Sequence, residues 1–285
     1  MPRSVQYAIF RKGSTTYFHA SLFFPEAVRT DVFSLYAFVR QADDYVDSTP
    51  QQQDEFEDFC ERWGGAAEGT PAGDVVIDGF AELASRKGFN PKWVDAFLAS
   101  MRSDLSKNRY ETHQELEQYL YGSAEVIGLM MAQVLDLPEE SHPSALVLGR
   151  AMQYINFIRD IDEDLALGRV YFPQAELRRY GLHGLERADA LEAPDQFSLF
   201  IRDRIAQYRL WQAEGEQGYR FIPYRYLIPI RTAAEMYRWT ASTIEENPMI
   251  IYEQKVRPSV SRIISAILSS GLRIPLSRVH LPQVG

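Results

Sequence analysis

Two short acidic runs, separated by more than a hundred residues, are the part of this chain best suited to chemistry. They occupy residues 43–47 (DDYVD) and 160–164 (DIDED), and each lies inside an otherwise apolar pattern of helical spacing. Unpaired carboxylates are costly in apolar surroundings, so both runs require a positively charged partner. If the two runs face each other, a cation between them would in turn hold a polyanionic substrate.

Helical geometry sorts the members of the two runs by face, at ~100° per residue. One face of the first helix, within an arc of roughly 60°, carries Tyr36, Arg40, Asp43 and Asp47. One face of the second, within an arc of roughly 100°, carries Asn156, Asp160, Glu163 and Asp164. Asp162 points away from that face. Carboxylates this close raise one another's pKa unless a cation compensates them. Oxygen ligands without sulfur favour Mg²⁺, with Mn²⁺ as the alternative.

Two simpler interpretations of the acidic runs compete with a metal site. A lone DxxxD pattern on a helix is usually a solvated face, but two such patterns in apolar surroundings, each with a nearby arginine, argue against it. A calcium-binding loop starting at Asp160 would place Leu165 where glycine is needed and Tyr171 where the terminal glutamate belongs. The sequence therefore favours the paired acidic site.

Candidate partners for phosphate groups surround the two runs. Arg40 lies one turn before Asp43, and Arg159 directly precedes Asp160. Residues 13–16 (GSTT) precede an expected helix at residues 17–24 and predict an anion site at its start. Lys255 and Arg257 could close the cavity from the C-terminal side. Most nearby aromatic residues are expected to be core, whereas Tyr36 and Tyr119 could offer ring faces to a cationic intermediate.

The elements that must position these residues are helical almost throughout. Apolar residues recur at three- and four-residue spacings over residues 28–46, 116–135, 145–167 and 199–211. Glycine and proline, including the Gly64-Gly65 pair, predict the ends of helices. With no repeat, linker or sustained strand-like alternation, we expect one all-α domain over residues 1–285, a helical bundle with a central cavity.

Composition narrows the range of partners. A net charge of -9 argues against nucleic acid, whose binding needs a basic surface. The single cysteine, Cys60, excludes an internal disulfide framework and fits a reducing compartment. The first residues lack the apolar stretch of a signal peptide, and no run approaches the ~18 apolar residues of a membrane span. We expect a cytoplasmic protein, with contact at a membrane surface through residues 258–276 as an open alternative to a core helix.

At these residues the chain resembles the squalene/phytoene synthase family, and within it the phytoene synthases. Residues 36–47 and 153–164 are similar to the first and second aspartate motifs of that family. The second motif continues into residues 168–173 (GRVYFP), and residues 119–130 resemble the tyrosine-rich cavity helix. Two residues depart from the pattern. Glu125 stands where a small residue is usual, and Lys255 where arginine is usual.

The resemblance implies an all-helical isoprenoid-synthase fold, with Mg²⁺ held by two acidic walls, and assigns roles to individual residues. The implied metal ligands are Asp43, Asp47, Asn156, Asp160 and Asp164. The implied catalytic residues are Tyr36, Arg40, Tyr119 and Arg159. The implied contacts to prenyl diphosphates are Gly13, Ser14, Thr15, Thr16, Tyr36, Arg40, Gln153, Arg159, Tyr237 and Lys255.

The reaction that the resemblance implies is a head-to-head condensation. One prenyl diphosphate ionises to an allylic cation, a second attacks it through its double bond, and a cyclopropylcarbinyl diphosphate then rearranges to a hydrocarbon. Ser21 is small at a position that could block the pocket, so we expect two geranylgeranyl diphosphates to give phytoene. The alternatives are squalene or dehydrosqualene formation from farnesyl diphosphate, with NADPH needed only for squalene, a cyclising terpene synthase, and a non-catalytic assembly factor. The oligomeric state is left open.

Overall fold

The computed structural model describes residues 5–272, and describes the side chains of all of these except residues 15, 16 and 268–272. Within this range the chain forms fifteen α-helices and, apart from one isolated bridge between Arg109 and Val170, no β-structure. The all-α prediction is therefore confirmed.

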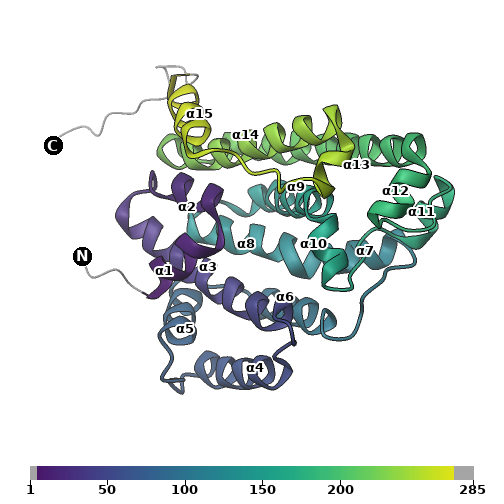
Figure 1. Cartoon of the computed structure of the whole chain (residues 1–285). Coiled ribbons are helices and arrows are strands. Elements are labelled where there is room, and N and C mark those ends of the chain that lie inside the picture. Colours follow the sequence, from purple (N-terminus) through teal and green to yellow (C-terminus); the bar gives the residue numbers. More distant parts are fainter. Residues whose placement is uncertain (1–4, 273–285) are drawn as a thin grey trace.

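The elements follow one another as a series of helices of very different length (Figure 1). The first eight are α1 (Val5–Gly13), α2 (Thr15–Ser21), α3 (Glu26–Asp47), α4 (Gln53–Ala67), α5 (Val75–Lys87), α6 (Pro91–Ser103), α7 (His113–Leu120) and α8 (Val126–Val134). The other seven are α9 (His142–Arg159), α10 (Ile161–Ala166), α11 (Gln174–Arg179), α12 (Arg187–Glu192), α13 (Pro194–Gly215), α14 (Tyr224–Glu246) and α15 (Val260–Leu272). Short helical segments of other types are η1 (Tyr121–Glu125, a π-helix), η2 (Glu139–Ser141), η3 (Glu216–Phe221) and η4 (Pro248–Tyr252).

Helix α3, which carries the first acidic run, is fixed by its apolar face. Its buried residues include Val32, Phe38 and Val46, at helical spacing. Phe38 is fully buried and stacks on Phe80 of α5 with ring centroids 3.9 Å apart. Burying a side chain of this size contributes about 1.5–3 kcal/mol, so the opposite, acidic face is held away from this core.

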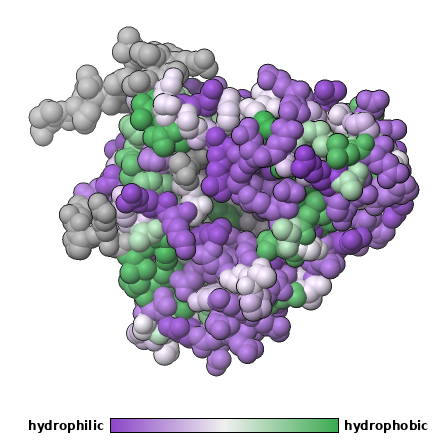
Figure 2. All heavy atoms as spheres, in the orientation of Figure 1, coloured by the Kyte–Doolittle hydropathy of each residue, from purple (hydrophilic) through white to green (hydrophobic). Residues whose placement is uncertain are grey.

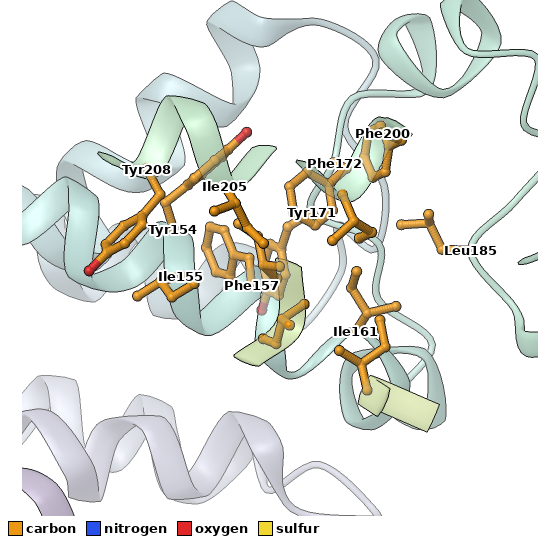
Figure 3. Packing of buried hydrophobic residues seen from close by; sticks show 14 of the residues in the cluster. Tyr154, Ile155, Phe157, Ile161, Tyr171, Phe172, Leu185, Phe200, Ile205 and Tyr208 are labelled. Carbon is orange, nitrogen blue, oxygen red and sulfur yellow. The ribbon is translucent and has the colours of Figure 1, made fainter. Parts of the chain in front are cut away.

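Helix α9, which leads to the second acidic run, lies between α8 and α14 and packs along α13 (Figure 1). Two residues of α9, Tyr154 and Phe157, belong to one buried cluster with Tyr171, Phe172 and residues of α13 (Figure 3). The Phe157 and Tyr171 rings stack at 4.2 Å between centroids. This contact ties the end of α9 to the segment that follows α10.

Three predicted boundaries are wrong. The helix expected over residues 145–167 breaks at Asp160, which has φ −101° and ψ 15° and separates α9 from α10. Gly64 and Gly65 lie inside α4, where the burial of Phe56, Phe59 and Trp63 outweighs a cost of about 1 kcal/mol per glycine. The helix expected over residues 17–24 begins at Thr15 and ends at Ser21.

Candidate active site

Both acidic runs line one cavity of about 920 Å³. Asp43, Asp44 and Asp47 of α3 form the first wall of the cavity. The second wall consists of Asn156, Asp160, Glu163 and Asp164. Asp162 is exposed and does not line it, as the helical geometry predicts. On the face drawn in Figure 2, a hollow with hydrophobic residues at its base has largely hydrophilic residues around it. The cavity thus combines charged walls with an apolar interior.

The first wall is crowded with carboxylates, and Arg40 of the same helix pairs with two of them. Arg40 donates from Nη1 to Asp43 Oδ2 at 2.8 Å and also pairs with Asp44. Burial, reinforced by the charge of Asp47, raises the pKa of Asp43 to about 8, although Arg40 opposes this shift. A carboxyl with such a pKa lacks sufficient positive charge in its surroundings.

The second wall shows the same shortage of positive charge. Arg159 donates from Nε to Asp160 Oδ1 at 2.8 Å, and Lys255 lies 3.4 Å from the same oxygen and pairs with Glu163. Burial, followed by the charges of Asp160 and Asp47, raises the pKa of Asp164 well above its usual value. Since Asp47 belongs to the first wall, the two walls lie close enough to repel each other.

Arg169 connects the two walls, and the sequence did not predict this role. Its guanidinium is buried, pairs with the Asp47 carboxylate, and donates to the Val46 carbonyl at 2.7 Å and the Asp104 carbonyl at 3.4 Å. The residue follows directly after the second acidic run, so a contact from it fixes the end of α3 against the α10 segment. The signal that the sequence offered for this role was an arginine directly after Gly168, at the start of an otherwise apolar stretch.

The donor set can be compared with what a hard divalent cation requires. In the part of the chain that the structure describes, no three His, Cys, Asp or Glu side chains are grouped closely enough to hold a metal ion. The acids instead pair with arginine or lysine, as Asp43, Asp47 and Asp160 do. The carbonyl oxygen of Asn156, however, is buried without a hydrogen-bond partner among these residues. An unpaired amide oxygen beside under-neutralised carboxylates fits a hard cation.

The predicted anion site at residues 13–16 is only partly described. Ser14 is the N-cap of α2, and its hydroxyl accepts a hydrogen bond from the Tyr17 backbone N–H at 3.2 Å. Gly13 and Ser14 line the cavity, whereas the side chains of Thr15 and Thr16 lie outside the described residues. A Cβ atom at Gly13 would lie 2.4 Å from the Tyr36 hydroxyl oxygen, so glycine permits Tyr36 to approach.

The remaining predicted contacts also reach the cavity. It is lined by Tyr36, Arg40, Tyr119, Gln153, Arg159, Tyr237, Lys255 and Arg257. Tyr36 stacks on Phe10 with ring centroids 3.8 Å apart. The Tyr17 and Tyr237 ring centroids are 5.7 Å apart. The structure thus brings the predicted side chains that it describes to one site, while their individual roles remain predictions.

Asp104, a second residue that sequence reasoning missed, supports the aromatic part of the site. The Tyr119 hydroxyl donates to Asp104 Oδ2 at 2.6 Å, and Asp104 Oδ1 has no partner among the described residues. Burial raises the pKa of Asp104 to about 7, while Arg169 opposes the shift. No local pattern links residues 104 and 119, because the contact depends on how α6 and α7 pack.

Glu125, which departs from the family pattern, lies away from the cavity. It is buried and accepts a hydrogen bond from Arg150 Nε at 2.6 Å. The Arg150 guanidinium in turn lies 5.2 Å from the centroid of the Trp211 ring. The departure is therefore accommodated by an ion pair between η1 and α9, behind the cavity wall.

Comparisons with known proteins agree with this geometry. The family model of squalene/phytoene synthase matches residues 10–263. The 15-cis-phytoene synthase of Synechococcus elongatus is 26% identical over 263 residues, covering 87% of this chain and 85% of that protein. Phytoene synthase 2 of Solanum lycopersicum is 30% identical over 248 residues, covering 82% of this chain and 78% of that protein.

A solved structure shares the fold. The crystal structure of a dehydrosqualene synthase in complex with ligand superimposes with a TM-score of 0.82 at 22% identity, covering 92% of this chain and 93% of that one. The predicted isoprenoid-synthase fold is thereby confirmed. With the family match extending over most of its length, the chain belongs to the squalene/phytoene synthase family, prenyltransferases that condense prenyl diphosphates head to head.

Proposed function

We propose that this protein condenses two geranylgeranyl diphosphates head to head to give phytoene, with release of diphosphate and dependence on Mg²⁺. The observation that carries the proposal is the meeting of two acidic walls and three cationic side chains, Arg40, Arg159 and Lys255, at one end of a largely apolar cavity. Such a site can bind a diphosphate at the walls and a hydrocarbon chain in the interior.

The residues that would hold the metal are Asp43, Asp47, Asn156, Asp160 and Asp164. They supply only oxygen ligands, as Mg²⁺ prefers, and Mn²⁺ is the alternative. When bound, the metal supplies charge stabilisation for the departing diphosphate.

The protein's own residues have three further tasks in this proposal. Arg40, Arg159 and Lys255 would bind diphosphate oxygens and stabilise the negative charge of the leaving group. The apolar cavity keeps water away from the allylic cation, which water would otherwise quench. The rings of Tyr36 and Tyr119 line the same space and can stabilise a cation through their faces.

The length of the cavity supports a C20 substrate. Its lining follows α9 from Ser144 to Asp160 at the second wall, a rise of about 24 Å at 1.5 Å per residue. A stretched geranylgeranyl chain of about 16 main-chain carbons reaches roughly 20 Å, at about 1.25 Å per bond, and a farnesyl chain reaches roughly 15 Å. Ser21, which is buried and lines the cavity, is small and so leaves room for a chain beside it.

The test is a product assay with purified protein, Mg²⁺ and equal amounts of C15 and C20 diphosphates, read by mass. We expect a C40 hydrocarbon as the main product without any reductant. A C30 product would contradict the chain length and favour the farnesyl alternative, and a requirement for NADPH would indicate squalene. If the protein bound both diphosphates but turned neither over, the result would instead favour a non-catalytic assembly factor.

We also propose that the protein contacts a membrane surface, because its substrates and product are lipids. No helix within residues 5–272 is long and apolar enough to span a bilayer. Helix α15 buries Ile263 and Ile267 against α14, while Val260 and Ile264, one turn apart, are exposed. α15 also packs on α2, after which Phe23 is half exposed. These outward apolar side chains could enter a lipid interface. Residues 273–276 of the predicted segment lie outside the described residues.

Liposome flotation tests this contact. The double variant Phe23→Ser, Ile264→Ser should bind vesicles at least about tenfold more weakly than the wild type, because two apolar anchors are lost. Leu210→Ser on α13 is the matched control, since Leu210 is also exposed. Equal flotation of all three proteins would exclude a role for this surface.

A further inference from the structure

The cavity continues past the first wall to a far end that the catalytic residues do not explain. There it is bordered by Leu135, Ser141 and Ser144 near the start of α9, and by Gly218 and Tyr219 of η3. Along α3, the lining runs from Asp47 to Val32, a rise of about 22 Å. This is close to the rise of about 24 Å along α9 from Asp160 to Ser144.

Close backbone contacts seal this far end. A Cβ atom at Gly218 would lie 2.5 Å from Ser144 Cβ, and a Cβ atom at Gly215 would lie 2.8 Å from Leu148 Cα. Real Cβ atoms do not come this close, so α9 packs this tightly against the end of α13 and against η3 only because both positions are glycine. The wall of the cavity where α9 meets α13 and η3 is consequently tightly packed.

Ser141 is a further small residue at this end of the cavity. Its side chain is 2% exposed and borders the cavity, and its hydroxyl has no hydrogen-bond partner in the described part of the chain. A buried unpaired hydroxyl costs about 1–3 kcal/mol. A large apolar side chain such as leucine at this position would relieve that cost but would fill the space. The feature of Ser141 that matters to the cavity is thus its small size.

We propose that Ser141, Ser144 and Gly218 form the floor of the substrate pocket and set the upper limit of chain length at C20. This inference rests on the proposed function. Along the α9 lining of about 24 Å, a C15 chain of roughly 15 Å ends short of the floor, a C20 chain of roughly 20 Å fits above it, and a C25 chain of roughly 25 Å would meet it. In this proposal, Ser21 leaves room for a C20 chain, and the floor stops chains that are longer.

The test compares Ser141→Leu and Ser144→Leu with the wild type in a mass-resolved assay containing C15, C20 and C25 diphosphates. Leucine fills the floor, so the preference for C20 over C15 should fall at least tenfold and C30 should replace C40. The wild type should leave the C25 diphosphate unused. Gln217→Leu is the matched control, because Gln217 neighbours Gly218 but is exposed, and its preference should equal that of the wild type.

The outcomes separate the floor from the reaction itself. One outcome is that the wild type condenses C15 and C20 diphosphates while the Ser141 and Ser144 variants show the same preference for C20 over C15. In that case the proposed role of the floor is wrong and the proposed function stands. If the wild type also condenses C25, the upper limit is wrong. If it condenses no prenyl diphosphate, the proposed function fails and the floor with it. Should a leucine variant not fold, Ser141→Val decides, because it breaks no hydrogen bond and should shift the preference in the same direction.

Discussion

Replacing Asp160 by asparagine should lower turnover by roughly a thousandfold while leaving the helical circular dichroism spectrum unchanged. Asparagine keeps the size of the side chain but removes the charge that, in our proposal, helps to hold Mg²⁺ and through it the diphosphate. Asp43→Asn on the opposite wall should lose activity to a similar extent. The measurement is the rate of diphosphate release from the prenyl substrate.

Asp162→Asn provides the matched control for these variants. Asp162 lies two residues from Asp160, yet it is exposed and does not border the cavity. This variant should release diphosphate at the rate of the wild type. If Asp160→Asn kept more than about a tenth of wild-type turnover, the metal-holding role of the second wall would have to be abandoned.

The largest expected effect on stability is that of Arg169→Met. Arg169 is 4% exposed, and its guanidinium binds the Asp47 carboxylate and two backbone carbonyls. Methionine fills much of the volume but leaves the Asp47 carboxylate without its arginine partner, whereas Gln51 Nε2 still donates to the Val46 and Asp104 carbonyls. Breaking a buried ion pair from one side costs about 3–5 kcal/mol, and we expect the free energy of unfolding to fall by that amount in urea denaturation.

A surface ion pair serves as the comparison. Arg178 pairs with Glu111 at 3.1 Å, with side chains 64% and 54% exposed. Arg178→Met should change the free energy of unfolding by less than about 1 kcal/mol, because exposed pairs contribute little. Similar effects of the two substitutions would show that Arg169 does not hold the walls together.

The spacing of residues within one helix was enough to predict much of the site. Three- and four-residue intervals place Asp43 and Asp47 on one face and turn Asp162 outward, and the structure agrees. Such intervals depend only on the geometry of a single helix. The family resemblance supplied what spacing cannot, namely that the two faces meet.

What the sequence missed depends on contacts between distant segments. The hydrogen bond from Tyr119 to Asp104 joins α7 to the end of α6, and Arg169 reaches Asp47 across more than a hundred residues. Neither contact leaves a periodic signal. The break at Asp160 was missed for a related reason, since the apolar spacing continues through it while the backbone turns. Tertiary packing decided each of these features.

The central claim, that both acidic walls act as one diphosphate site, can be tested by titration calorimetry with inorganic diphosphate and Mg²⁺. The wild type should bind diphosphate only when Mg²⁺ is present. Asp43→Asn and Asp160→Asn should each weaken this binding at least about tenfold, and the double variant should bind little worse than either single variant, because residues of one site are not additive. Wild-type affinity in either single variant would contradict the claim.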